Sequence, residues 1–249
     1  FGLKEKIHIL GAGSNTLISD KTYEGVVIKL GKNFANISML PNSTIIAGSA
    51  CSDKKLSDFT MENEVGGFEF LACIPGTVGG GLRMNAGCFN REFKDILLSV
   101  QAIDRNGRVL TIPAKKIMFE YRNNDLPEDL IFLSASFKGL NKDKEKIKTE
   151  IIELKDKKDN SQPTKIKTSG STFKNPINQS DKKVWQLIKE SVPQDLNFGD
   201  ASISEKHFNF FVNKGDASFN DMIKLINFVQ EKVKKKTGII LEKEIKILE

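Results

Sequence analysis

Four polar side chains crowd into the short segment Gly170–Pro176, which reads Gly-Ser-Thr-Phe-Lys-Asn-Pro. They are Ser171, Thr172, Lys174 and Asn175, and the glycine before them lets the backbone come close to a ligand. Two interpretations fit this pattern. The Ser and Asn side chains can cap a turn by bonding to local backbone. Alternatively, the hydroxyl, ammonium and amide groups contact a polar ligand.

A longer segment, Ile74–Gly87, holds five glycines, at positions 76, 79, 80, 81 and 87. Each glycine loses more backbone entropy on folding than any other residue, so neither an amphipathic helix nor a strand is expected here. The N–H groups of Gly79 to Gly81 can instead point at phosphate oxygens and form an anion-binding nest. A glycine-rich turn without a ligand fits the same composition.

A second glycine-rich turn, Gly11–Ser19, follows the short apolar run 7–10. It is not the usual dinucleotide fingerprint, because the third glycine of G-x-G-x-x-G falls at Thr16. Two phosphate-compatible loops on one chain suggest a diphosphate held from two sides.

Three charged side chains are further candidates for chemistry. Arg122 follows Tyr121, and its planar guanidinium suits a carboxylate. Glu242 and Glu244 point the same way if they share a strand, because side chains alternate along a strand. Taken alone, a surface arginine and two solvent-facing carboxylates are the default interpretation.

Composition excludes several classes of protein. With 249 residues, 39% hydrophobic and 28% charged, the chain is typical of a soluble protein with one large or two modest domains, and no apolar run reaches the length of a membrane span. The net charge of +6 resides largely on solvated lysines without interleaved aromatics, which argues against nucleic-acid binding. Three cysteines without C-x-x-C spacing and only two histidines argue against a disulfide framework or a metal site and indicate a cytoplasmic location. No obligate protein partner is inferred.

Hydrophobic periodicity predicts a mixed α+β chain in which short elements present these residues. Strands are predicted at 7–10, 26–30, 36–40, 43–48, 96–104, 109–112, 130–137, 208–213 and 239–248, the first two of them buried. Helices are predicted at 52–64, 142–158, 183–191 and 218–236. Asn106-Gly107 predicts a two-residue hairpin turn. In the second helix Ile147, Ile151, Ile152 and Leu154 are expected to face inward.

Six motifs in this order resemble the UDP-N-acetylenolpyruvoylglucosamine reductase family, and the match spans nearly the whole chain. They are G-A-G-S-N-T-L-I-S-D from Gly11, G-F-E-F-L-A-C-I-P-G-T-V-G-G-G-L-R-M-N-A-G to Gly87, Tyr121-Arg122, G-S-T-F-K-N-P, S-E-K-H to His207, and L-E-K-E-I to Ile245. The resemblance implies an FAD-binding domain of the p-cresol-methylhydroxylase type over 1–158. It also implies a smaller α+β substrate-binding domain over 159–239, with the final strand, about 240–249, returning to the first domain.

The resemblance also assigns roles to residues. It makes Ser171 the proton donor, places Arg122 in the active site, and makes Glu244 a stabiliser of the enol-like intermediate. The cofactor-binding residues it implies are Gly11, Ala12, Gly13, Ser14, Asn15, Thr16, Pro75, Gly76, Thr77, Gly79, Gly80, Asn85, Ala86 and Gly87. The substrate-binding residues it implies are Tyr121, Lys174 and Asn175, with Lys157, Lys158 and Lys165 as candidates for the nucleotide diphosphate.

The activity so implied is NADPH-dependent reduction of UDP-N-acetylglucosamine enolpyruvate, through bound FAD, in bacterial peptidoglycan precursor synthesis. A serine is a poor acid and serves only where the acceptor is a much stronger base, such as an enolate or carbanion. Two alternatives stay open: another flavin oxidase or dehydrogenase of the same fold, or a nucleotide-sugar binder without activity. The branch of the family without a long Tyr-bearing loop is the closer match.

Overall fold

The computed structural model describes residues 6–163 and 166–249 and confirms the predicted α+β class. The chain divides into two compact units. Unit 1 runs up to Ala12 and continues over Gly25–Lys158, and unit 2 comprises Gly13–Glu24 and Asp159–Glu249. The first glycine-rich turn is therefore shared between the units, because the division follows Ala12.

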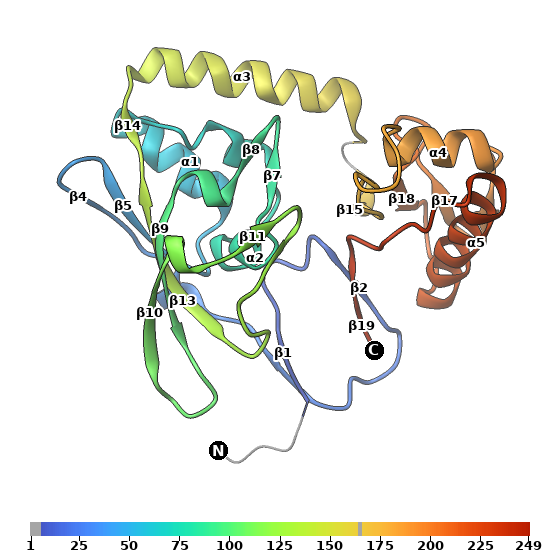
Figure 1. The fold of residues 1–249 in the computed structure, drawn as a ribbon, viewed down its shortest axis with the longest axis horizontal. Helices are drawn as coiled ribbons and strands as arrows, with labels where there is room; N and C mark the ends of the chain where they lie inside the picture. Colours follow the sequence, from blue (N-terminus) through green and yellow to red (C-terminus); the bar gives the residue numbers. More distant parts are fainter. Residues whose placement is uncertain (1–5, 164–165) are drawn as a thin grey trace. The chain divides into compact units, whose positions relative to one another are not determined.

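Unit 1 is built on a five-stranded antiparallel sheet with the order β10-β9-β13-β5-β4 (Figure 1). Its strands are β4 (Ile37–Leu40), β5 (Thr44–Gly48), β9 (Leu97–Ile103), β10 (Val109–Pro113) and β13 (Ile131–Lys138). Alternate residues of the central strands, among them Ile45, Ala47 and Ala135, are buried in the core. The sheet is thus the support on which the glycine-rich segment is packed.

Shorter elements complete unit 1. The small strands are β1 (Ile7–Ile9), β3 (Val26–Ile28), β6 (Val65–Gly66), β7 (Gly87–Cys88), β8 (Arg91–Glu92), β11 (Phe119–Glu120), β12 (Asn123–Asn124) and β14 (Leu140–Asn141). The α-helices are α1 (Asp53–Glu62), α2 (Val78–Arg83) and α3 (Lys144–Ser161), whose last three residues fall in unit 2. The 3-10 helices are η1 (Lys32–Phe34), η2 (Glu69–Cys73), η3 (Phe93–Asp95) and η4 (Ala114–Lys116).

Several local predictions for unit 1 need correction. β1 and β3 pair in parallel, but they are not buried, since Val26 and Val27 are 36% and 41% exposed. The turn after β9 is a three-residue loop, in which Asp104 Oδ1 accepts from two backbone N–H groups and Gly107 takes the positive φ of 79°. In α3 the buried stripe is Ile147 and Ile151, and Ile152 is 51% exposed.

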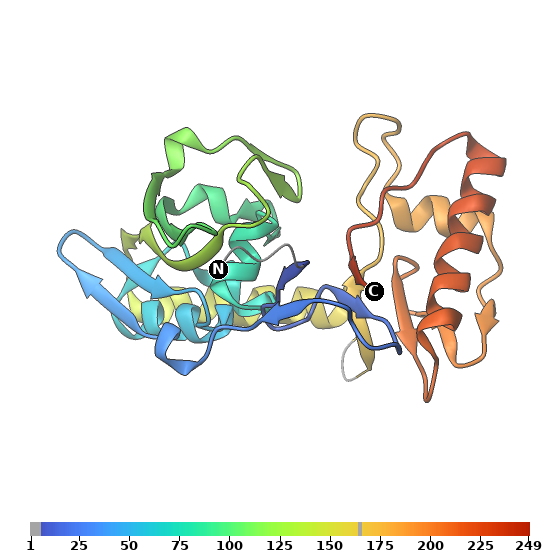
Figure 2. The same cartoon turned by 90° about the horizontal axis from the view of Figure 1, so that it is seen from below.

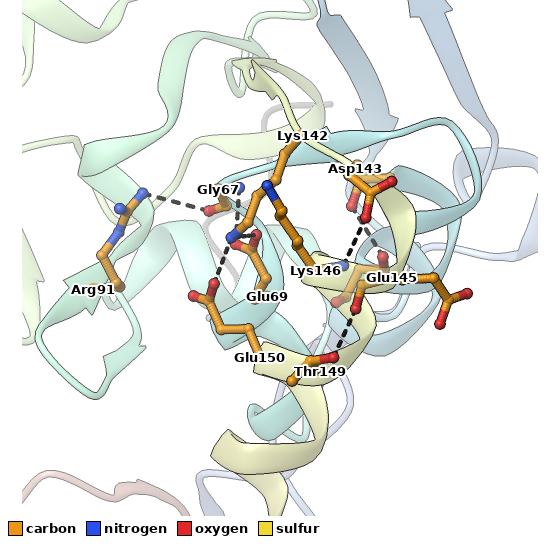
Figure 3. A network of polar contacts seen from close by, with 11 residues as sticks. Gly67, Glu69, Arg91, Lys142, Asp143, Glu145, Lys146, Thr149 and Glu150 are labelled. Carbon is orange, nitrogen blue, oxygen red and sulfur yellow. Dashed lines mark hydrogen bonds and ion pairs between the residues drawn. The ribbon is translucent and has the colours of Figure 1, made fainter.

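A polar cluster ties β14, η2 and α3 together (Figure 3). Lys142 Nζ lies 2.8 Å from Glu69 Oε1 and also pairs with Glu150. The Glu69 side chain is 5% exposed, and its other oxygen accepts from the N–H of Gly67 at 2.8 Å. A nearly buried carboxylate is thus neutralised by one lysine, which is the requirement for burying a charge.

Unit 2 is a four-stranded antiparallel sheet with two helices that pack against each other (Figure 2). The sheet order is β15-β18-β17-β16. The elements are β2 (Thr16–Ile18), β15 (Lys167–Ser171), α4 (Val184–Ser191), β16 (Asn197–Phe198), β17 (Ala201–Ile203), β18 (Phe210–Asn213), α5 (Phe219–Thr237) and β19 (Lys246–Leu248). The predicted capping box at the start of α5 is confirmed, because Ser218 and Asp221 bond to each other's backbone N–H groups.

The chain end is not the long strand that was predicted. Only Lys246–Leu248 is β, and it pairs in parallel with β2 inside unit 2. The preceding residues meet the sheet at a single bridge, between Lys243 and Phe173. Leu241, Ile245 and Leu248 are buried, and this spacing of four and three residues is not the period of two that a strand requires. Among the residues that the structure describes, no helix has the length and apolarity needed to cross a membrane.

Candidate active site

The two glycine-rich turns meet in unit 1. A Cβ added at Gly11 would lie 2.9 Å from Thr77 Oγ1 and 3.7 Å from Gly80 Cα, so only a glycine fits at this approach. Thr77 is the N-cap of α2, and its hydroxyl accepts from the N–H of Gly80 at 3.4 Å. The predicted juxtaposition of the two turns therefore has a direct contact at Gly11.

The glycine-rich segment forms a helix, α2, where no helix was predicted. Its glycines serve close packing rather than a nest. A Cβ at Gly79 would lie 2.9 Å from Ser49 Cβ, and one at Gly81 would lie 2.2 Å from Phe93 Cε2. The Gly79 and Gly81 N–H groups donate to the carbonyls of Ser49 and Thr77, at 2.9 and 2.8 Å. The expectation that N–H groups of Gly79 to Gly81 point at phosphates is wrong for these two.

Backbone N–H groups without protein acceptors lie instead in the first glycine-rich turn and at the start of the segment Ile74–Gly87. In the part of the chain that the structure describes, the N–H groups of Gly11, Ala12, Gly76 and Thr77 donate to no protein acceptor. Ala12 is exposed and the other three are half-buried. Backbone N–H groups without protein acceptors are available to an anion, so these four fit a phosphate group.

The end of the glycine-rich segment is fixed by Asn85. This side chain has no exposed surface; its Nδ2 donates to Glu92 Oε2 and Glu120 O, and its Oδ1 accepts from the N–H of Lys94. Asn85 takes a positive φ of 44°, a conformation that asparagine tolerates better than most residues. In this structure the Asn85 side chain holds the loop together, and its contact with a cofactor stays a prediction.

Arg122 lies in a two-residue turn between β11 and β12 with φ 57°. Its Nη2 donates to Gly87 O at 2.8 Å, and its guanidinium carbon is 5.0 Å from the centre of the Tyr121 ring. A left-handed conformation costs a non-glycine residue about 1–2 kcal/mol, and such strain is concentrated at functional sites. The structure thus holds a half-buried guanidinium at the last glycine of the segment.

In unit 2, Ser171 ends β15 after an irregularity in the ladder. Thr168 pairs with Val212 and Ser171 with Phe210, so β15 has one residue more than β18 between these two pairs. Gly170 accommodates this bulge by adopting a positive φ of 81°. Its N–H donates to Thr168 Oγ1 at 3.2 Å. Ser171 is half-buried, whereas the next residue, Thr172, is buried.

Glu244 is bonded to the residue beside Ser171. The N–H of Glu244 donates to Thr172 O at 2.9 Å, and the N–H of Lys174 donates to Glu242 O at 2.8 Å. Glu244 is half-buried, whereas the Glu242 side chain is 71% exposed and pairs with Lys174 at 2.6 Å. Unit 2 therefore joins the main chain beside Ser171 to the main chain of Glu244, two positions 73 residues apart, counted from 171 to 244.

Comparisons with known proteins agree with this arrangement. Residues 3–113 match the family model of an FAD binding domain, and residues 162–248 match UDP-N-acetylenolpyruvoylglucosamine reductase, C-terminal domain. The UDP-N-acetylenolpyruvoylglucosamine reductase of Pelagibacter ubique is 75% identical over 248 residues, which are 100% of this chain and 82% of that protein. The chain belongs to this reductase family. The enzyme of the same name from Rickettsia conorii is 46% identical, over 98% of this chain and 82% of its own.

A solved structure supports the same conclusion. The crystal structure of UDP-N-acetylenolpyruvylglucosamine reductase from Thermus caldophilus has a TM-score of 0.87 and 30% identity. The match covers 99% of this chain and 86% of that one. As a member of the reductase family, the chain is an FAD-containing oxidoreductase.

Asn15 and Asp20 lie in the first glycine motif of this reductase and have structural bonds within unit 2. Asn15 Nδ2 donates to Glu244 O at 2.9 Å, and Asn15 O accepts from the N–H of Lys246. Asp20 Oδ2 accepts from the N–H of Phe219 at 2.7 Å and so caps α5. The motif therefore helps to fix the segment that carries Glu244, a role that sequence reasoning missed.

Other predicted residues of the reductase are placed as follows. Asn175 Oδ1 accepts from the N–H of Val184 at 3.0 Å, at the start of α4. Lys158 Nζ donates to Cys73 O at 2.8 Å, Lys157 is exposed, and Lys165 lies outside the described residues.

His207 is the second of the two histidines and is placed as a structural residue. Its Nδ1 accepts from the N–H of Asn209 at 3.2 Å, and burial lowers the pKa of its ring. The ring also packs edge-on against Phe210, with 4.8 Å between ring centres. These contacts are structural ones, made with residues 209 and 210.

Asn209 itself was not singled out from the sequence. It is 3% exposed, and both ends of its side-chain amide bond to Phe173. The only signal was a polar residue inside the apolar run Phe208–Val212.

Proposed function

We propose that this chain catalyses the NADPH-dependent reduction of UDP-N-acetylenolpyruvoylglucosamine, the enolpyruvyl ether of UDP-N-acetylglucosamine, to UDP-N-acetylmuramate. The curated relatives carry the name of this reductase. The residues to which the resemblance assigns the chemistry are present as Arg122, Ser171 and Glu244. A cytoplasmic place in peptidoglycan precursor synthesis follows from the same proposal.

The open N–H groups of Gly11, Ala12, Gly76 and Thr77 fit the FAD diphosphate. Backbone donors can hold a phosphate without a basic side chain close by. The other residues proposed to contact the cofactor are Gly13, Ser14, Thr16, Pro75, Gly79, Gly80, Ala86 and Gly87. FAD held there would supply hydride-transfer chemistry, with NADPH as the hydride donor and the enol-ether double bond as the acceptor.

The main-chain bond from the N–H of Glu244 to the carbonyl of Thr172, the residue after Ser171, is the observation that supports the proposed chemistry. As hydride adds to the terminal carbon of the enol ether, negative charge grows on the neighbouring carbon and its carboxylate. That carbanion is basic enough to take the hydroxyl proton of Ser171. Glu244, held through Thr172 O, assists in stabilising the enol-like form.

Arg122 is proposed to face the carboxylate that gains charge during hydride addition. A guanidinium stays protonated at all relevant pH values and offers two parallel donors to a carboxylate. Its strained turn and its bond to Gly87 O hold the side chain before substrate arrives, which is the form of electrostatic preorganisation that lowers a barrier. Tyr121, Lys174 and Asn175 are proposed to line the substrate site.

The test separates the two half-reactions by anaerobic stopped-flow absorbance of the flavin. Ser171→Ala is expected to leave reduction of the flavin by NADPH within about threefold of wild type and to slow reoxidation by the enol ether by roughly 10²–10⁴-fold, the usual contribution of a general acid. The matched control is Ser169→Ala, which removes the same hydroxyl from the same strand, and both half-reactions are expected to stay near wild type. Equal loss of both half-reactions in Ser171→Ala would contradict the assigned role.

A further inference from the structure

Asn209 makes three hydrogen bonds to the two residues that follow Ser171. Its side-chain Oδ1 accepts from the N–H of Phe173 at 3.0 Å, and its Nδ2 donates to Phe173 O at 2.8 Å. Its main-chain carbonyl accepts from the N–H of Thr172 at 2.8 Å. Asn209 is 3% exposed and Phe173 has no exposed surface, so water does not compete for these bonds.

These bonds lie where the β-ladder stops. The last pair between β15 and β18 is Ser171 with Phe210. Asn209 immediately precedes β18, so it lies just beyond this last pair. There the Asn209 amide pairs with both main-chain groups of Phe173, as a neighbouring strand would. The side chain thus continues the ladder past Ser171.

The opposite side of the same segment holds Glu244. The carbonyl of Thr172 accepts from the N–H of Glu244 at 2.9 Å, and Phe173 forms a bridge with Lys243. Residues 172–173 therefore lie between Asn209 on one side and the Glu244 segment on the other. The backbone of this segment is thus bonded both to Asn209 and to Glu244.

Among the side chains, only an amide of this length offers a donor and an acceptor that match one residue's N–H and C=O. An ionised aspartate accepts but cannot donate, and alanine leaves two buried main-chain groups without partners. The requirement at position 209 is therefore chemical as well as steric.

We infer that Asn209 is a positioning residue for the proton transfer, because it holds the segment that carries Ser171 and anchors Glu244. The inference rests on the proposed roles of Ser171 and Glu244. Asn209 itself is buried, and it acts through the backbone of Phe173 and Thr172.

The experiment compares Asn209→Asp and Asn209→Ala with Asn213→Ala in the FAD-loaded full chain. Asn213 is a matched control, because it is the last residue of β18, which Asn209 precedes, and its amide bonds to Gly215 and Ala217 in the turn that follows the strand. The Asn209 variants are expected to slow flavin reoxidation by the enol ether on the order of 10- to 100-fold, the effect of a misplacement of about 1 Å. The rate of flavin reduction by NADPH in the Asn209 variants is expected to stay within about threefold of wild type. Both half-reactions of Asn213→Ala are expected to stay within the same limit.

Two further measurements separate positioning from general damage. When Asn209→Asp is added to Ser171→Ala, flavin reoxidation is expected to be less than about threefold slower than in Ser171→Ala alone. The reason is that the effects of two substitutions on the rate do not add when the residues act as a unit. Asn209→Asp is also expected to recover reoxidation as the pH falls, because the protonated acid regains a donor for Phe173 O. If Asn209→Ala does not fold, the aspartate variant provides both measurements.

Equal slowing of both half-reactions, or full additivity with Ser171→Ala, would overturn the inference. So would reoxidation at the wild-type rate in folded Asn209 variants. A different result marks failure of the proposed function: Ser171→Ala itself would then reoxidise at the wild-type rate. The two failures are distinguished by the Ser171→Ala single variant.

Discussion

The buried carboxyl of Asp53 predicts an unusual dependence of stability on pH. Asp53 is the first residue of α1, it has no exposed surface, and neither of its side-chain oxygens has a partner within the described structure. Burial raises its pKa from 3.8 to about 8. Its N–H donates to Gly76 O at 3.2 Å, so it lies directly behind the proposed phosphate-binding backbone.

Whether stability rises or falls with pH depends on which state, folded or unfolded, binds the proton of Asp53. Between the two pKa values, the folded chain keeps a proton that the unfolded chain has released. The contribution of protonated Asp53 to the free energy of unfolding is fully present below about pH 4. Above that pH the free energy of unfolding falls by about 1.4 kcal/mol for each pH unit, and the contribution is lost as the pH rises through about 8. The full loss is on the order of 5 kcal/mol, which is a large share of the stability of a typical domain.

Asp53→Asn isolates this contribution, because the amide has nearly the same shape and does not ionise. We expect the difference in unfolding free energy between variant and wild type to change by about 4 kcal/mol in the variant's favour from pH 5 to pH 8. The assay is urea unfolding followed by far-UV circular dichroism at several pH values and one FAD concentration. Asp58→Asn, on the same helix but with a half-exposed side chain, is the control, and its difference is expected to change by less than about 1 kcal/mol. Parallel pH curves for wild type and Asp53→Asn would refute the reasoning.

Two further predictions concern unit 1. Gly81→Ala is expected to lower stability by about 1–3 kcal/mol, because the added Cβ would lie 2.2 Å from Phe93 Cε2. Gly80→Ala, whose Cβ would meet its nearest neighbour at 3.5 Å, is expected to be neutral or stabilising in thermal unfolding, and an equal loss in both would contradict the packing argument. Lys142→Met is expected to cost roughly 3 kcal/mol, because it leaves a buried glutamate unpaired, whereas Lys144→Met breaks an exposed pair and is expected to cost less than about 1 kcal/mol in urea unfolding. Similar losses for the two lysines would show that burial of the glutamate is not the cause.

The regular elements of the fold could be predicted because their signals are local. The capping box at Ser218, for example, consists of two side chains three residues apart, and the apolar stripe that follows has a clear helical period. Helix α2 could not be predicted, because its stability comes from tertiary packing. Its glycines have the lowest helix propensity after proline, but Ser49 and Phe93 leave no room for larger residues.

The site was predicted through its motifs, and its supports were not. Ser171 and Glu244 lie in recognisable motifs, but the bond between Thr172 O and the N–H of Glu244 joins main-chain groups that every residue possesses. The same holds for Asn209, whose amide bonds to the backbone of Phe173. Sequence patterns identify side chains with a chemical role, and they carry little information on which backbone a distant asparagine will hold.

Unit 2 shows why such supports matter for the chemistry. Ser171 ends a strand and Glu244 lies in an irregular segment, so neither side chain is fixed by regular secondary structure. Each segment is held by an asparagine from elsewhere in the chain: Asn209 holds the first, and Asn15 Nδ2 donates to Glu244 O in the second. An alcohol is a weak acid that gains its reactivity from placement against a basic carbon, and a shift of about 1 Å removes much of that gain. The two asparagines therefore support the proposed proton transfer through the backbone of the segments that carry Ser171 and Glu244.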